Sequence, residues 1–405
     1  MTERVVVAGA GHAAGQLVAR LRAEEYAGEI VLVGDESSLP YQRPPLSKAY
    51  MAGEIGLERV LLRNQAFYDD NSIDVRLNTR VEHINCDQNS VTLSDGSELE
   101  YSHLVLATGT RVRELAVAGA DLGGIAYLRT LEDADGIGAA LKATPRVVVV
   151  GGGYIGLEVA AIARKAGSDV TVLEAMPRVL ARTTTEVTSA HMAKLHADNG
   201  VVLRTEARVA SFSGDQGKVS GVVLDDGEVV GADLVVIGVG VLPNQEIAAT
   251  AGITVDDGIV VDARGATSVA NVWAIGDCTR HPSAVYGKSL RLESVHNAMT
   301  QSRVVAANIA GKDAEYNEVP WFWTDQYDAK LQSVGVPDGY DETVVRGDPA
   351  SGAFTVFALA GGRVVASESV NSMREHMDCR KLAGAQVQVA ADVLANPETN
   401  LKELL

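Results

Sequence analysis

The feature that most constrains this chain is a glycine-rich loop that occurs twice, each time directly after a run of β-branched residues. Residues 9–14 read G-x-G-x-x-A after the run at 5–7, and residues 151–156 read G-x-G-x-x-G after the run at 147–150. In such a loop the first glycine makes a tight turn, the second lets the backbone approach a pyrophosphate, and the third small residue lets helix and strand pack closely. Each loop would leave a helix N-terminus facing phosphates. Two dinucleotide-binding units of the Rossmann type are therefore predicted.

An acidic residue ends the strand that follows each loop. Asp35 follows the apolar run at 30–33, and Glu174 follows the run at 169–173. A carboxylate at this place accepts hydrogen bonds from an adenosine ribose and repels a 2′-phosphate. Glu174 therefore favours NADH over NADPH. The plainer alternative is that both acids are solvated strand ends.

The similarity of the two units extends beyond the loops. Asp95-Gly96 and Asp226-Gly227 each stand between alternating apolar runs, which indicates a β-hairpin. An apolar strand follows each hairpin, at 104–106 and at 234–237. Each unit is predicted to be a βαβ core with an antiparallel hairpin and a returning strand.

Composition excludes several classes of protein. With 405 residues, 46% of them hydrophobic, the chain can bury two or three cores. A net charge of −18 disfavours nucleic acid as a partner. No basic and apolar leader and no long uncharged apolar run is present, so a cytoplasmic location without membrane contact is expected. Cys86, Cys278 and Cys379 form no C-x-x-C, and the eight histidines show no metal spacing, so no metal is expected.

Four further segments carry a family resemblance. They are Pro-Tyr-Gln-Arg-Pro-Pro-Leu-Ser-Lys at 40–48, Ala-Thr-Gly at 107–109, Gly276-Asp277, and Trp-Phe-Trp-x-Asp-Gln-Tyr at 321–327. With the two loops, they make the chain resemble the FAD-dependent, NADH-oxidising ferredoxin reductases of oxygenase systems, the putidaredoxin reductase and rubredoxin reductase type. The resemblance implies an α/β protein with two Rossmann-like dinucleotide-binding domains and a C-terminal α+β domain. The expected bounds are 1–112 with 243–315 for FAD, 113–242 for NADH, and 316–405 for the third domain.

The resemblance also implies the site residues. Tight, non-covalent FAD would contact Gly9, Gly11, Ala13, Ala14, Asp35, Lys48, Val81, Arg129, Asp277, Val295 and Trp323. NADH would contact Gly151, Gly153, Tyr154, Ile155, Gly156 and Glu174. Lys48 would stabilise the anionic reduced flavin and pair with Glu158. Glu158 and Glu293 would flank the nicotinamide, and Tyr154 would gate the ring face.

Missing cysteines decide the expected acceptor. Dithiol reductases and NADH peroxidases of this fold place redox cysteines against the flavin, whereas this chain has none before Cys86. Cys278 follows Asp277 directly, at a position expected to be buried and inert. Electrons would then leave the flavin one at a time, which suits a [2Fe–2S] ferredoxin. Because the ferredoxins of such systems are acidic, docking is expected near Arg303 and near basic residues of the C-terminal domain, Arg374, Arg380 and Lys381.

Other interpretations stay open. Trp321 and Trp323 would line the electron path or simply belong to a core. The protein is expected to be a monomer or a weak dimer. His296, next to Val295, stands where relatives often carry proline, and a change in the hydrogen bonding of the flavin ring is an open expectation whose direction the sequence does not give. Two alternative functions are a flavoprotein NADH oxidase or peroxidase, and an NADH-sensing flavoprotein resembling apoptosis-inducing factor.

Overall fold

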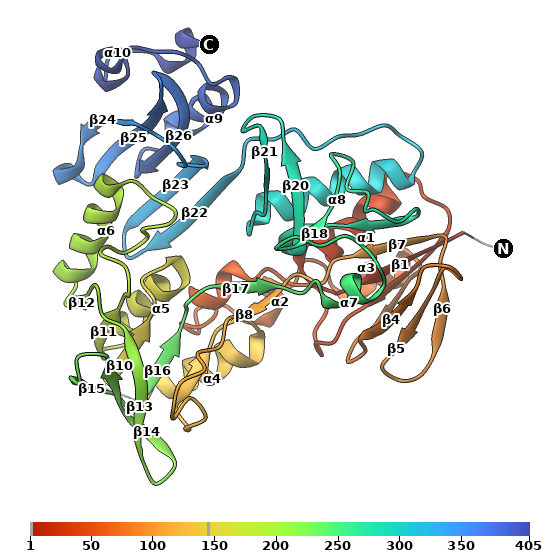
Figure 1. The fold of residues 1–405 in the computed structure, drawn as a ribbon, viewed down its shortest axis with the longest axis horizontal. Coiled ribbons are helices and arrows are strands. Elements are labelled where there is room, and N and C mark those ends of the chain that lie inside the picture. The colour runs from red at the N-terminus through yellow and green to blue at the C-terminus, as the bar shows by residue number, and fades with distance from the viewer. Residues whose placement is uncertain (1–2, 144–145) are drawn as a thin grey trace. The chain divides into compact units, whose positions relative to one another are not determined.

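The computed structural model describes residues 3–143 and 146–405; the first two residues of the predicted FAD domain lie outside it. The chain divides into two units (Figure 1). Unit 1 comprises Met1–Arg43, Leu57–Arg111 and Leu242–Pro320. Unit 2 comprises Pro44–Gly56, Val112–Val241 and Trp321–Leu405. Within the described residues, no helix is both long and apolar enough to cross a membrane.

Unit 1 is built on a five-stranded parallel sheet. Its order is β19-β7-β1-β2-β3, with bounds Val272–Ala274, His103–Leu106, Arg4–Ala8, Glu29–Val33 and Ile73–Arg76. The run at 5–7 is fully buried in β1, as expected for a central parallel strand with helices on its faces. β19 pairs with β7, so the segment before Gly276-Asp277 returns to the first sheet, as predicted from the sequence.

Two long helices of unit 1 lie side by side against this sheet, α1 (His12–Ala23) and α8 (Val295–Ile309) (Figure 1). The hairpin predicted at Asp95-Gly96 is present in the antiparallel sheet of β4, β5 and β6. The bounds of these strands are Val81–Asn85, Ser90–Leu93 and Glu98–Glu100. Other elements of the unit are α2 (Leu57–Val60), α3 (Gln65–Asp70), α7 (Glu246–Thr250), β18 (Ile259–Val260), η2 (Gly276–Cys278), β20 (Thr279–Ser283) and β21 (Lys288–Leu290).

Unit 2 repeats the order of the four core strands around the second glycine-rich loop. Its parallel sheet has the order β12-β11-β10-β16-β9, with bounds Val202–Arg204, Asp169–Leu173, Arg146–Val150, Leu234–Ile237 and Ile125–Tyr127. Its edge strand β9 precedes this core in the chain, whereas β19 of unit 1 follows its core. The second predicted hairpin lies between β14 (Lys218–Leu224) and β15 (Val229–Gly231), next to β13 (Val209–Asp215). The helices are η1 (Pro44–Ser47), α4 (Leu131–Leu141), α5 (Tyr154–Lys165) and α6 (Glu186–Asp198). The short strands β8 (Thr110–Val112) and β17 (Val241–Pro243) pair with each other.

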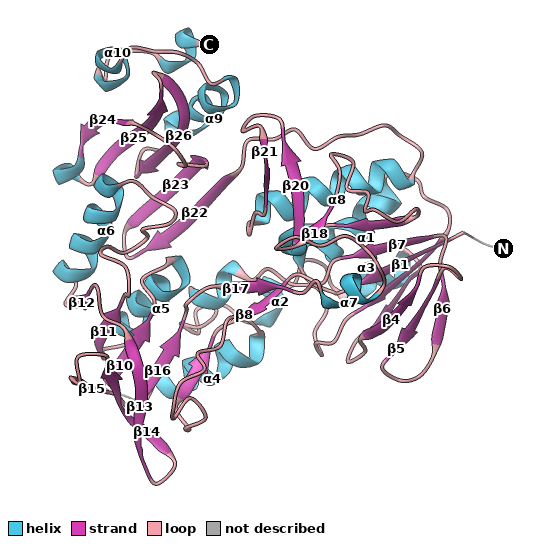
Figure 2. Cartoon of the chain, viewed as in Figure 1, coloured by secondary structure: helices cyan, strands magenta, loops and turns pink. Residues whose placement is uncertain are grey.

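The C-terminal part of unit 2 is an antiparallel sheet with helices beside it, the α+β arrangement predicted (Figure 2). Its order is β22-β23-β26-β25-β24, with bounds Trp321–Gln326, Ala329–Gly335, Arg363–Val370, Ala353–Ala360 and Glu342–Asp348. The helices are η3 (Pro349–Ser351), η4 (Met373–Glu375), α9 (His376–Ala385), α10 (Ala391–Ala395) and η5 (Leu401–Leu404).

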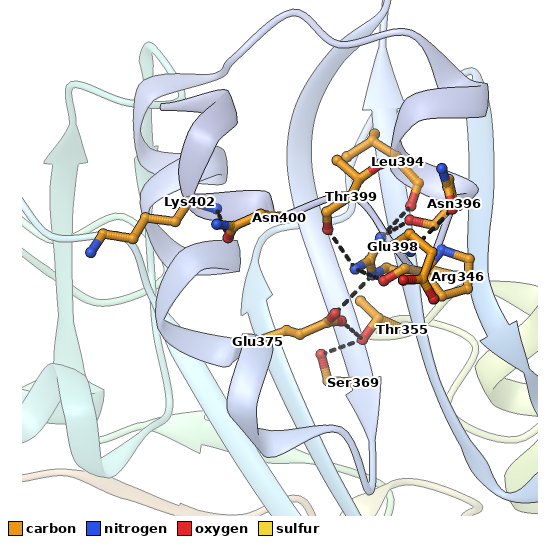
Figure 3. Close-up of polar contacts among 11 residues, drawn as sticks. Arg346, Thr355, Ser369, Glu375, Leu394, Asn396, Glu398, Thr399, Asn400 and Lys402 are labelled. Atoms are coloured by element: carbon orange, nitrogen blue, oxygen red, sulfur yellow. Dashed lines mark hydrogen bonds and ion pairs between the residues drawn. The ribbon is translucent and has the colours of Figure 1, made fainter.

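The buried side chain of Arg346 bonds the segment 394–399, near the C-terminus, to this sheet (Figure 3). The Arg346 guanidinium on β24 bonds Glu375 at 2.8 Å. It also donates to the backbone carbonyls of Leu394, Asn396, Pro397 and Thr399. Because an arginine has five N–H donors and no acceptor, the Glu375 carboxylate and the four carbonyls together satisfy it. Arg346 therefore holds the segment after α10 in one conformation.

Candidate functional site

The first glycine-rich loop, in unit 1, has the backbone that a pyrophosphate site requires. Gly9 has φ +110°, and a Cβ there would lie 2.3 Å from the Ala107 carbonyl oxygen. Gly11 is the N-cap of α1, and a Cβ there would meet nothing within 4 Å. No side chain caps this helix and no acid lies in its first turn. Within the described residues, the first N–H groups of α1 therefore have no capping side chain, which fits an anionic ligand.

A histidine beside this loop also fits a bound polar group. Both ring nitrogens of His12 are buried and have no hydrogen-bond partner among the described residues. Burial, helped by the positive charge of Arg43, lowers the pKa of His12 to about 4, so the imidazole is neutral at pH 7. Buried polar atoms in native proteins are nearly always paired. Unpaired nitrogens next to Gly11 are therefore consistent with a cofactor that supplies the partners.

The acid predicted to bind the ribose, Asp35, is exposed at the end of β2. The next residue, Glu36, has its own partners: it accepts from the Tyr41 hydroxyl and from Arg43, each at 2.5 Å. The charge of Asp277 also acts on the Arg43 guanidinium. Arg43 is therefore fixed by Tyr41 and Glu36 after β2, and the charge of Asp277 favours its protonated form. Sequence reasoning missed the roles of Glu36 and Arg43, although Arg43 stands inside the proline-rich motif.

The Gly276-Asp277 turn is held against α1 and α8. Gly276 has φ +81°, and a Cβ there would lie 3.0 Å from that of Ala13. The Gly276 N–H donates to the Gln301 side chain of α8 at 2.6 Å. Val295 is the first residue of that helix. Gly276 therefore lies against Ala13 at the start of α1, Asp277 follows it in the chain, and Val295 begins the neighbouring helix α8. Ala14 is buried in α1, and Val81 begins β4.

The second loop, in unit 2, has the same geometry. Gly151 has φ +109°, a Cβ on Gly156 would lie 2.0 Å from the Gly151 carbonyl oxygen, and a Cβ on Gly153 would meet nothing within 4 Å. The start of α5 has no side-chain cap and no acid. Glu174 accepts hydrogen bonds from the Gly152 and Met176 amides, each at 2.7 Å. The acid and the loop are therefore joined directly, and Ile155 is exposed beside them.

A buried ion pair lies in the same unit. Lys48 Nζ is 2.7 Å from Glu158 Oε1, with the carboxylate 4% exposed and the lysine 20% exposed. Glu158 projects from α5, while the prolines of η1 preset the backbone just before Lys48. The carboxylate also accepts from the hydroxyls of Ser47 and, at 2.5 Å, Thr324. The structure thus pairs the two residues expected to pair, and adds two hydroxyl donors that were not predicted.

Contacts between aromatic rings are found at the start of α5 and in the first strand of the C-terminal sheet. The Tyr154 ring is 4.6 Å from the Phe322 ring, and burial raises the pKa of Tyr154 to about 12. Trp321 lies 5.4 Å from Trp323 and 5.2 Å from His376. The Arg380 guanidinium covers Trp321 at 5.8 Å.

Two further candidates, Glu293 and Arg129, have partners within their own units. Glu293, in unit 1, is largely exposed and forms an ion pair with Arg291, which also bonds Asp257 at 3.3 Å. Arg129, in unit 2, precedes the capping box of α4, where its N–H donates to Asp133 at 2.9 Å.

Comparison with known proteins identifies the family. Residues 3–302 match the model described as pyridine nucleotide-disulphide oxidoreductase, and residues 321–405 match the one described as reductase C-terminal. The chain belongs to the pyridine nucleotide-disulphide oxidoreductase family. It is 44% identical to putidaredoxin reductase of Pseudomonas putida, over 100% of this chain and 97% of that protein. It is 43% identical to rhodocoxin reductase of Rhodococcus erythropolis, over 98% and 93%.

Solved structures of two ferredoxin reductases are closely similar to this chain. A ferredoxin reductase from Rhodopseudomonas palustris has a TM-score of 0.97 at 41% identity, covering 99% of both chains. Putidaredoxin reductase in its covalent complex with putidaredoxin has a TM-score of 0.96 at 43% identity, covering 99% of this chain and 98% of that one. The family assignment and the two-Rossmann fold predicted from the sequence are confirmed. The protein is an oxidoreductase of the ferredoxin reductase type, and FAD and NAD(P)H are its cofactors.

Proposed function

We propose that this protein passes electrons from NADH through FAD to a [2Fe–2S] ferredoxin that supplies an oxygenase. The observation that carries the proposal is the presence of two dinucleotide loops without a redox thiol beside them. The three cysteines form no disulfide, and Cys278 next to Asp277 is fully buried, where burial raises its pKa. A thiol held in its neutral form is a poor nucleophile and redox partner. The electrons therefore need an acceptor outside the chain.

Each cofactor has its residues in this proposal. FAD is held by Gly9, Gly11, Ala13, Asp35 and Asp277. When bound, it accepts two electrons and releases them singly. Lys48 offers a fixed positive charge to the reduced flavin, and Glu158 holds the ammonium in place through the 2.7 Å contact. Glu293 would flank the nicotinamide. Val81, Arg129, Val295 and Trp323 complete the proposed flavin contacts.

Glu174 supports NADH as the electron donor. Its carboxylate is fixed by the Gly152 and Met176 amides, so its charge stays at the carboxyl end of β11. A 2′-phosphate brought to this place would meet a fixed negative charge, whereas two ribose hydroxyls could donate to it.

Two basic regions support docking of an acidic ferredoxin on a chain whose net charge is −18. Arg303 on α8 is 55% exposed and touches Glu318 at 3.2 Å. In the C-terminal part, Arg374 on η4 and Lys381 on α9 are exposed, and Arg380, which precedes Lys381 on α9, covers Trp321. Local positive charge accelerates the encounter of such partners.

The experiment for the function compares acceptors under steady-state NADH oxidation. We expect rapid reduction of a [2Fe–2S] ferredoxin and slow consumption of oxygen or peroxide. If every ferredoxin in a panel fails while oxygen or peroxide turns over quickly, the protein is an oxidase or peroxidase. A long-lived NADH complex with no fast acceptor would instead identify an NADH-sensing flavoprotein.

The docking assignment has its own test with a matched control. Arg303→Glu should slow ferredoxin reduction by roughly tenfold at low salt and leave NADH–ferricyanide activity unchanged. Arg80→Glu is the control, because Arg80 is also an exposed arginine of unit 1 that contacts a glutamate, Glu82, at 3.3 Å. An equal loss in both variants would mean that overall charge, rather than this surface, governs docking.

A further inference from the structure

The C-terminal sheet packs on α5, which follows the second dinucleotide loop, and on α6. Leu331, Phe354, Val356 and Val370 of the sheet form one cluster, and Tyr154 of α5 and Val187 and Leu195 of α6 pack against it. Three polar side chains of the same sheet, two on β22 and one on β26, also bond to these elements or to the segment just before them. Thr324 donates to Glu158, Gln326 bonds His196 at 2.8 Å, and Glu368 bonds Thr185.

Glu368 is the most buried charge in this contact. It is 2% exposed, and its two carboxylate oxygens accept from the Thr185 N–H and the Thr185 hydroxyl, each at 2.7 Å. Burial raises the pKa of Glu368, although the hydroxyls of Thr185 and Thr188 and the charge of Arg178 oppose the rise. A buried carboxylate is costly unless donors are fixed around it. Glu368 of the C-terminal sheet therefore fixes the position of Thr185.

Thr185 ends the segment that begins at Glu174. This segment is tied to the second loop at two points, because Gly152 N–H donates to Glu174 at 2.7 Å and Leu180 N–H donates to the Gly152 carbonyl at 2.9 Å. It then closes as a tight turn at Leu180, which has φ +54° and whose carbonyl accepts from the Thr184 hydroxyl. Thr185 does not cap α6 with its own hydroxyl. Instead, the Thr185 hydroxyl donates to the Glu368 carboxylate.

We propose that Glu368 is a positioning residue for NADH binding: it fixes the far end of the 174–185 segment, so that Glu174 and Leu180 hold the second loop in its binding conformation. The C-terminal sheet would thus set dinucleotide affinity through one buried carboxylate. The inference rests on the proposed assignment of NADH to this loop.

The test uses the FAD-loaded full chain and measures the Kd of NAD⁺ by calorimetry, together with KM and kcat for NADH with ferricyanide. Glu368→Leu removes both hydrogen bonds to Thr185 at similar side-chain volume. It should raise the Kd of NAD⁺ and the KM of NADH roughly tenfold, which corresponds to about 1.4 kcal/mol of binding free energy, and leave kcat unchanged. Glu368→Gln keeps an acceptor for the Thr185 N–H and should stay near wild type. Thr185→Val removes one bond from the other side and gives a smaller rise, and it replaces Glu368→Leu should that variant not fold.

A control on the same strand separates positioning from general stability. Ser369→Ala removes the 3.0 Å contact with Thr355, which belongs to the Arg346 cluster drawn in Figure 3. Among the described residues, no hydrogen bond joins the Ser369 side chain to the 174–185 segment. Its NAD⁺ affinity should equal that of wild type even where its unfolding temperature falls. An unchanged Kd in both Glu368→Leu and Thr185→Val, or an equal rise in Ser369→Ala, would overturn the proposal. Wild-type protein that binds no NAD⁺ would instead refute the NADH assignment.

Discussion

The Lys48–Glu158 pair predicts an asymmetric double-mutant cycle. Lys48→Met leaves a carboxylate that is 4% exposed and whose remaining donors, among the residues that the structure describes, are the hydroxyls of Ser47 and Thr324. Breaking a buried ion pair from one side costs about 3–5 kcal/mol, and the two remaining donors should limit the loss here to about 2–4 kcal/mol. Glu158→Gln leaves an ammonium that is 20% exposed and 3.3 Å from the Pro44 carbonyl, so it should cost about 1 kcal/mol.

The double variant should be more stable than Lys48→Met alone, because it no longer buries an unpaired charge. Residues in direct contact couple by about 0.5–3 kcal/mol, and this pair should lie at the upper end of that range. Urea unfolding followed by tryptophan fluorescence measures the free energies, with an unchanged dependence on denaturant as the control. Equal losses in the two single variants, or additive losses in the double variant, would refute the view that Glu158 is the buried member and Lys48 its principal charge partner.

Three further outcomes follow from individual side chains. Asp277→Ala should weaken FAD binding by about 1.5–3 kcal/mol, the worth of a charge-assisted hydrogen bond, and flavin release on dilution measures this loss. Unchanged retention of FAD would show that Asp277 is not part of the site. Glu174→Ala should raise kcat/KM for NADPH relative to NADH, whereas a wild type equally efficient with both would reject the assignment of Glu174. Burial lowers the pKa of His281 to about 4 from 6.5. The stability from its neutral ring is complete above pH 6.5 and is lost as pH falls from 6.5 towards 4, by up to about 3 kcal/mol. Unfolding of His281→Gln should therefore depend less on pH across this window, and an unchanged dependence would contradict it.

Much of the fold could be predicted because its signals are local. A buried parallel strand reads as a β-branched run, as at 147–150, and a hairpin reads as an Asp-Gly turn, as at Asp226-Gly227. The return of β19 to the first sheet followed from the need to bring Gly276-Asp277 to the first loop.

The partners that fix the site could not be predicted in the same way. Ser47 and Thr324 stand 111 and 166 residues from Glu158, and they meet it because η1 and β22 pack against α5. Glu368 and Thr185 are 183 residues apart. Such contacts depend on how one element packs on another, and neither periodicity nor a local motif encodes them. A family resemblance supplied the Lys48–Glu158 pair, but the geometry of its surroundings came only from the structure.

The central claim is that NADH delivers two electrons which leave this protein one at a time to a [2Fe–2S] ferredoxin. The most direct measurement is an anaerobic titration of the FAD-loaded protein and excess oxidised ferredoxin with NADH, followed by the visible absorbance of the iron–sulfur cluster. We expect two ferredoxins reduced for each NADH added. Flavin that becomes reduced while the ferredoxin stays oxidised would contradict the account.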